Sequence, residues 1–67
     1  MTSDRLTARE HEALRHAANG DTYAETGRAM HCSSETVRGY FKWIRRRLVA
    51  RNKAHAVAIG YQRGLLP

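Results

Sequence analysis

The sequence of 67 residues contains one cysteine, one proline and no long hydrophobic run. A lone cysteine, Cys32, cannot form an internal disulfide, which excludes a small secreted scaffold held by disulfides. No apolar run reaches the roughly 18 residues of a membrane span, and the polar N-terminus lacks the apolar core of a signal peptide. These absences favour a cytoplasmic protein. Because the one proline is the last residue, helices can form throughout the chain.

Residue patterns typical of catalysis and metal binding are missing as well. The sequence has no glycine-rich phosphate loop, no serine with a plausible base and no carboxylate pair in an expected cleft. The histidines lack zinc-finger spacing with the cysteine, and so short a chain cannot surround a sizeable cofactor. We therefore expect a protein that is not an enzyme and has no metal and no cofactor.

Acidic residues are absent from the second half of the chain. Residues 1–35 carry six carboxylates and four basic side chains, a net charge of −2, and residues 36–67 carry eight basic side chains, a net charge of +8. A one-sided positive field favours a polyanionic partner, most often nucleic acid. The alternative is a solvated helix face rich in arginine. The carboxylates are Asp4, Glu10, Glu12, Asp21, Glu25 and Glu35.

Two short motifs mark the beginnings of helices. Thr7 is followed three residues later by Glu10, and Thr22 is followed three residues later by Glu25. In this spacing each side chain can satisfy a free backbone N–H of the first helical turn, which is a capping box. Gly20 between the two motifs can end the first helix in the left-handed conformation.

Two further helices follow from similar signals. Ser33 or Ser34 can cap a third helix and Asn52 a fourth, while Gly64 follows the fourth. With no strand pattern and no linker, we predict an all-α fold of four helices in which residues 1–67 form a single domain. The predicted helices span about 7–19, 22–30, 34–48 and 52–63.

The predicted third helix has one apolar face and one basic face. Its apolar residues follow spacings of four, three and four, which places them on one buried stripe. The other residues should point outward, and Arg47 should turn back to pair with an acid of the first helix, for which we name Glu12. The stripe is Val37, Phe41, Ile44 and Leu48, and the outward residues are Arg38, Gly39, Lys42, Trp43, Arg45 and Arg46.

The predicted second and fourth helices leave more open. Gly27 inside the second helix either allows another helix to cross closely or is a weak spot. After the fourth helix, Leu65 and Leu66 should fold back on the other helices. The inner face of the fourth helix is expected to hold Ala56, Val57, Gly60 and Tyr61.

A short helix, a three-residue turn and a longer basic helix have the form of a helix-turn-helix, whose second helix fits the major groove of B-DNA. The residues also resemble the LuxR-type (GerE-like) helix-turn-helix domain of bacterial transcription regulators, without a gap over nearly the whole chain. The matching segments are Leu6-Thr7-x-Arg9-Glu10-x-Glu12, Gly20 with Glu25, Ser33-x-x-Thr36-Val37, Ile44 with Arg47-Leu48, Arg51 to Lys53, Ala56-Val57 and Gly64-Leu65-Leu66.

This resemblance implies which residues contact DNA. The helix over 34–48 would read bases and the helix over 52–63 would pair two copies into a homodimer. Val49-Ala50 departs from the glycine-valine that usually forms the turn between these helices. The implied base-reading residues are Arg38, Gly39 and Lys42, and the candidates for phosphate contacts are Thr22, Ser34, Thr36, Arg45, Arg46 and Lys53.

The sequence therefore predicts a small transcription regulator that binds double-stranded DNA sequence-specifically, with the third helix in the major groove. The alternative is an adaptor of the same fold that docks on another regulator or on RNA polymerase. The bare backbone at Gly39 and the outward Trp43 motivate this alternative.

Overall fold

The computed structural model describes residues 5–67, so Asp4 lies outside the described residues. It contains four helices, as expected: α1 (Ala8–Ala18), α2 (Tyr23–Met30), α3 (Ser34–Leu48) and α4 (Lys53–Gln62). Their ends differ from the predicted ranges by one residue at most, because the ranges counted the capping residues. The all-α fold class is thus confirmed.

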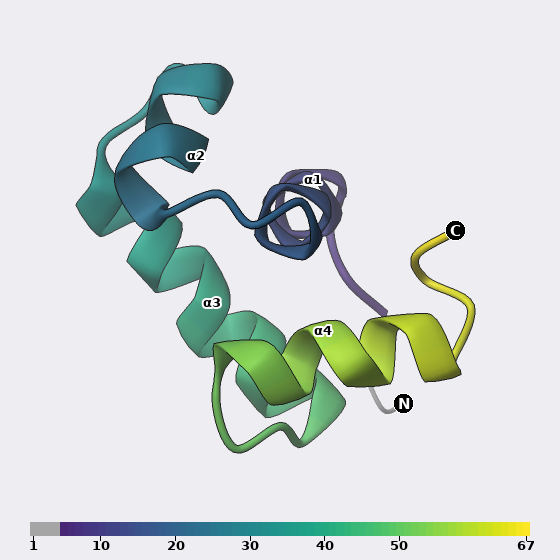
Figure 1. The fold of residues 1–67 in the computed structure, drawn as a ribbon. Coiled ribbons are helices and arrows are strands. Elements are labelled where there is room, and N and C mark those ends of the chain that lie inside the picture. Colours follow the sequence, from purple (N-terminus) through teal and green to yellow (C-terminus); the bar gives the residue numbers. More distant parts are fainter. Residues whose placement is uncertain (1–4) are drawn as a thin grey trace.

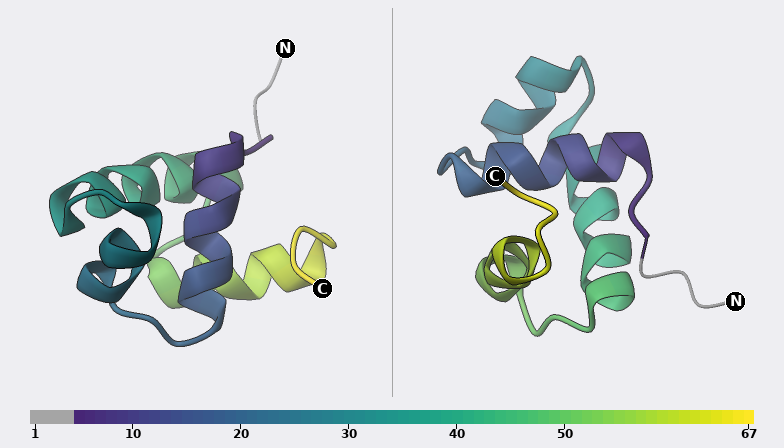
Figure 2. Two further views of the ribbon diagram at one scale, coloured as in Figure 1. Left: turned by 90° about the horizontal axis from the view of Figure 1, so that it is seen from above. Right: turned by 90° about the vertical axis from the view of Figure 1, so that its right-hand side faces the viewer.

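Helices α1 and α3 form the centre of the molecule, and each packs against the three other helices. In Figure 1, α1 is seen end-on, α2 lies beside the beginning of α3, and α4 crosses below α1. The two views of Figure 2 show α1 crossing α3, and the right-hand view shows the C-terminal segment turning from the end of α4 toward α1. This arrangement leaves one long face of α3 without a covering helix.

Both capping boxes are present. Thr7 Oγ1 accepts a hydrogen bond from Glu10 N at 3.1 Å, and the Glu10 carboxylate accepts one from Thr7 N at 2.9 Å. Thr22 and Glu25 repeat the arrangement at 3.1 and 2.8 Å. Each box satisfies two of the backbone N–H groups that a helix start leaves without partners, so the sequence fixes where α1 and α2 begin.

The core forms around the apolar stripe of α3, as predicted. Val37, Phe41, Ile44 and Leu48 are all buried, and they pack with buried residues of the other helices. Burial of these side chains away from water is the main force that holds α3 in place. The other buried hydrophobic residues are Ala13, Leu14, Met30, Ala56, Ile59 and Leu66.

The predicted inner face of α4 is partly wrong. Tyr61 is 51% exposed, whereas Ile59, which the prediction omitted, is buried together with Ala56 and Gly60. The reason is that α4 carries apolar residues on all sides, so its sequence contains no single stripe to choose. Leu66 does fold back into the core, as expected.

Arg47 turns inward, but it pairs with a different acid from the one predicted. Its Nε lies 3.4 Å from Glu10 Oε1, and its Nη1 donates to the backbone oxygen of Arg5 at 3.2 Å. Glu12 instead lies 3.6 Å from Arg9 on its own helix. Glu10 is buried on the side of α1 that faces the core, so it is the acid within reach of α3.

The turn between α3 and α4 holds a valine in an unfavourable conformation. Val49 has φ 56° and ψ 49°, the left-handed region that favours glycine. It is also 78% exposed. Burial of the Val49 side chain therefore does not compensate for the strain at this residue.

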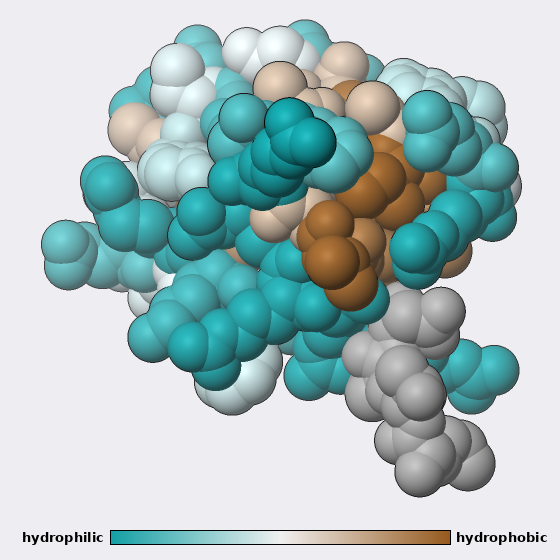
Figure 3. Space-filling model, turned by 90° about the horizontal axis from the view of Figure 1, so that it is seen from below, coloured by the Kyte–Doolittle hydropathy of each residue, from teal (hydrophilic) through white to brown (hydrophobic). Residues whose placement is uncertain are grey.

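Seen from below, the molecular surface is mostly hydrophilic, and its hydrophobic residues gather in a patch near the middle of this face (Figure 3).

Candidate nucleic-acid interface

The turn between α2 and α3 fixes the beginning of α3. His31 ends α2 in the left-handed conformation, with φ 60°, and Cys32 N donates to Gly27 O at 2.8 Å. A Cβ atom on Gly27 would lie 2.6 Å from Cys32 O. The close approach that needs this glycine is thus made by the backbone of the turn, and not by another helix. Ser33 then caps α3 by accepting from Thr36 N at 3.0 Å.

The outer face of α3 is exposed along its length. The six residues predicted to point outward are all exposed, opposite the buried stripe: Arg38, Gly39, Lys42, Trp43, Arg45 and Arg46. Because four of the six are cationic, this face presents positive charge to the solvent over most of α3.

The three predicted base-reading residues lie together on this face. Arg38, Gly39 and Lys42 line a shallow hollow with Glu35 and Arg45. The guanidinium carbon of Arg38 lies 5.3 Å from the centre of the Tyr23 ring, a cation–π contact with α2. This contact holds the Arg38 guanidinium beside α2, and the residue stays exposed to the solvent.

The predicted phosphate-binding hydroxyls lie at the beginnings of α2 and α3. Thr22 Oγ1 is the capping acceptor of α2, and Thr36 Oγ1 lies 3.0 Å from Ser33 Oγ. Ser34, half-buried, is the first residue of α3. Helix N-termini carry free N–H groups and partial positive charge, which suits an anion.

Lys53, also predicted to contact phosphate, is engaged inside the domain. Its Nζ donates to the backbone oxygen of Asp21 at 3.1 Å and lies 4.4 Å from the centre of the Tyr23 ring and 5.7 Å from that of Phe41. The structure therefore joins α4 to the loop before α2 and to α3 through one ammonium group.

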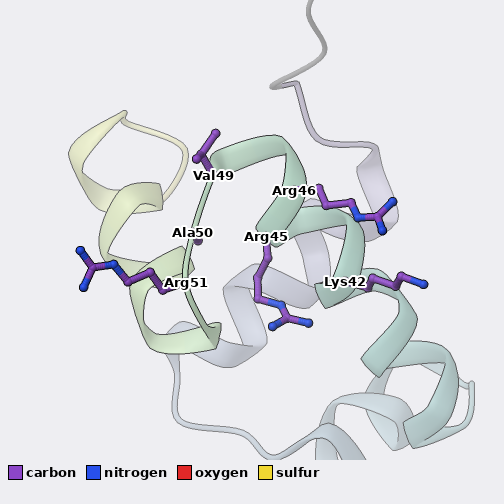
Figure 4. A pocket seen from close by; sticks show the side chains of 6 residues that line it. All are labelled: Lys42, Arg45, Arg46, Val49, Ala50 and Arg51. Carbon is purple, nitrogen blue, oxygen red and sulfur yellow. The ribbon is translucent and has the colours of Figure 1, made fainter.

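A second hollow lies at the C-terminal end of α3, between α3 and the turn that leads to α4 (Figure 4). Figure 4 shows Arg45 in the middle, Lys42 and Arg46 pointing outward from α3, and Arg51 pointing away on the other side. Arg51 was not singled out in the sequence as a DNA contact. That Arg51 lines the same hollow as Arg45 is apparent only in the fold.

Two aromatic side chains of α3, Trp43 and Tyr40, contact arginines. The Arg46 guanidinium lies 5.2 Å from the centre of the Trp43 ring, which is 48% exposed. Arg9 Nε donates to Tyr40 Oη at 3.4 Å, and this hydrogen bond raises the pKa of Arg9 above its ordinary value. Arg9 also donates to Met30 O at 3.0 Å, which joins α1 to the end of α2.

A short helix and a tight turn followed by a longer helix with a basic outer face, all supported by a crossing helix, define a helix-turn-helix domain. Comparison with known families agrees. The family model described as bacterial regulatory proteins of the luxR family matches residues 4–59. The chain belongs to this family of DNA-binding transcription regulators, as its sequence resemblance implied, and the family is not one of enzymes.

A relative from Bacillus subtilis is also described as a transcriptional regulatory protein. The chain is 39% identical over 59 residues to YvfU, described as an uncharacterized transcriptional regulatory protein, and the match covers 88% of this chain. It covers 30% of the relative, so the chain spans less than a third of that protein's length. Within residues 5–67, no helix is long and apolar enough to cross a membrane.

Proposed function

We propose that this chain binds double-stranded DNA in a sequence-specific manner as part of a transcription regulator in the bacterial cytoplasm, with α3 in the major groove. The observation that carries the proposal is the division of α3 into two faces. One face is buried in the core, and the opposite face exposes Arg38, Lys42, Arg45 and Arg46. An α-helix fits the major groove, where arginine and lysine side chains can bond guanine edges.

Contacts to phosphates would position α3 in the groove. We assign these contacts to the hydroxyls of Thr22, Ser34 and Thr36 and to the cations Arg45, Arg46 and Lys53. Lys53 donates one hydrogen bond to Asp21 O, and its ammonium group has two further N–H donors for a phosphate. With about four phosphates neutralised per subunit, the logarithm of the affinity should fall with the logarithm of salt at a slope near −3.6.

Selection from random DNA tests the proposal. The chain should enrich a defined sequence, and Arg38→Ala should lower the preference for it over random DNA by about fivefold or more. Arg15→Ala removes an exposed arginine from α1 and is the charge-matched control. Equal losses on both kinds of DNA for Arg38→Ala would show that Arg38 does not read bases.

We further propose a homodimer through α4. Ala54, Val57, Ala58 and Tyr61 follow spacings of three, one and three, so they share one stripe of α4, and none of them is fully buried. A helix that is apolar on its outer side as well as its inner side is typical of one covered by a partner.

Sedimentation at a series of concentrations tests the pairing. Ala58→Glu places a charge in the middle of the stripe and should shift the chain to monomers. Ala29→Glu, at an exposed position of α2, is the control and should leave pairing unchanged. If Ala58→Glu leaves the association constant unchanged, α4 does not form the dimer contact.

The exposed ring of Trp43 supports a second candidate, an adaptor that docks on another regulator or on RNA polymerase. Large exposed aromatic rings are frequent in protein interfaces. A gel shift on genomic fragments with and without polymerase distinguishes the two functions, because an adaptor would retain DNA only in the presence of polymerase.

A further inference from the structure

Glu35 differs from the other carboxylates in the described part of the chain. Of the five in residues 5–67, four have partners: Glu10 with Thr7 and Arg47, Glu12 with Arg9, Asp21 with His16 at 2.9 Å, and Glu25 with Thr22. Glu35 is exposed, and within these residues it makes no hydrogen bond or ion pair.

The position of Glu35 is also unusual. It lies on the outer face of α3 and lines the same hollow as Arg38, Gly39 and Lys42. An acid in the first turn of a helix is favourable on any side of that turn, so the helix itself does not require it on this face. The negative charge of Glu35 repels phosphates. If Glu35 contributes to DNA binding, it must therefore contact a group other than a phosphate.

Gly39, one turn after Glu35, opens the hollow. A Cβ atom on Gly39 would meet no atom within 4 Å, so nothing within the described fold requires a glycine. Glycine inside a helix lowers its stability relative to alanine. The glycine leaves bare backbone between Arg38 and Lys42, where an external group can approach α3 closely.

We propose that Glu35 is a specificity-determining residue that accepts a hydrogen bond from the N4 amino group of a cytosine, and that Gly39 makes room for this base edge. The inference rests on the proposed function, because it assumes that α3 enters the major groove. It adds a residue and a base preference to those that the sequence indicates.

The chemistry of the carboxylate selects cytosine. An ionised carboxylate only accepts hydrogen bonds, and the major groove presents two amino donors, cytosine N4 and adenine N6. Beside the adenine amino group lies N7, an acceptor that repels a second carboxylate oxygen. Glutamate therefore favours cytosine, whereas glutamine can donate to N7 and accept from N6 and so favours adenine.

The test compares the sequences that the whole chain and its variants select from random duplex DNA. Glu35→Ala should lower the preference for cytosine at one position by about fivefold or more and should bind random DNA as tightly as the unchanged chain or more tightly. Glu35→Gln, which keeps the size of the side chain, should move the preference at that position from cytosine to adenine.

One further variant is a control, and another tests the role of Gly39. Glu12→Gln makes the same charge change on α1 and should raise binding to all DNA without altering the selected sequence. Gly39→Ala adds a methyl group to the hollow, so it should keep or raise the melting temperature while weakening the same cytosine preference.

The outcomes separate this inference from the proposed function. If the unchanged chain enriches no sequence, both are overturned. If it enriches a sequence that depends on Arg38, but Glu35→Ala and Glu35→Gln select the same sequence with the same preference, the role of Glu35 is overturned and the proposed function stands.

Discussion

The carboxylates of α1 and α2 are bound within the domain, whereas most cations of α3 face the solvent. Glu10 and Glu25 close the capping boxes, and Asp21 binds His16. On α3, Lys42, Arg45 and Arg46 are exposed on a face that no helix covers. The comparison teaches that the charge asymmetry of the sequence has two separate components: acids that hold helix ends and cations that are exposed to the solvent.

Both halves of the sequence contain exceptions to this division between bound acids and exposed cations. In the second half, Arg47 and Lys53 contact groups of the first half and so contribute to the fold. In the first half, Glu35 is the exposed acid beside the cations. The predictions below test this division through the free energy of unfolding.

The largest effect is expected for Glu10→Ala. The change removes a capping acceptor and the carboxylate that faces Arg47 in a buried position, which should cost about 2–4 kcal/mol of stability. Urea denaturation measures it. Glu12→Ala, which breaks only the exposed pair with Arg9, should cost less than about 0.5 kcal/mol; equal losses for both variants would contradict the special role of Glu10.

The next effect is expected for Lys53→Ala. Loss of the hydrogen bond to Asp21 and of the contacts with Tyr23 and Phe41 should cost about 1–2 kcal/mol. Lys53→Met keeps much of the apolar stem and separates packing from charge. If Lys53→Ala is as stable as the unchanged chain, the contacts of Lys53 do not stabilise the fold.

A gain in stability is expected for Val49→Gly. Glycine adopts the left-handed conformation of residue 49 without steric cost, so the change should stabilise the domain by about 1 kcal/mol, or about 4–8 °C in melting temperature. Ala50→Gly lies outside the left-handed region and should lower stability by about 0.4–1 kcal/mol. A lower melting temperature for Val49→Gly would mean that the valine side chain stabilises the turn.

The smallest change in stability is expected for the double variant Arg45→Ala and Arg46→Ala. Since both side chains lie on the outer face, the free energy of unfolding should change by less than about 0.5 kcal/mol per site. The salt slope of DNA binding should become shallower by about 1.8, from 0.9 per lost phosphate contact. An unchanged salt slope would show that neither arginine contacts a phosphate.

Local signals in the sequence were sufficient for most of the fold. The threonine and glutamate pairs fixed the beginnings of α1 and α2, and the stripe of α3 fixed which side is buried. These predictions succeeded because capping and helix periodicity depend on residues a few positions apart.

Predictions that depend on contacts between helices were less accurate. The choice of Glu12 instead of Glu10 for Arg47 and the omission of Ile59 from the core both required the relative placement of helices. The contact of Lys53 with Asp21 joins residues far apart in the sequence, and no local pattern indicates it. The roles of the DNA-contacting residues stay predictions, although the fold brings Arg38, Gly39 and Lys42 to one hollow.

The ammonium group of Lys53 lies where α4, the loop before α2 and the ring of Phe41 on α3 meet. If two copies join through α4, any tilt of that helix must move this junction and with it the entry angle of α3. Dimerisation and DNA affinity would then be thermodynamically coupled, and each would change the other by the same factor. A dimer would bind two half-sites on the DNA, one for each copy of α3. The distance between them would then depend on the contacts of Lys53 as well as on the dimer contact.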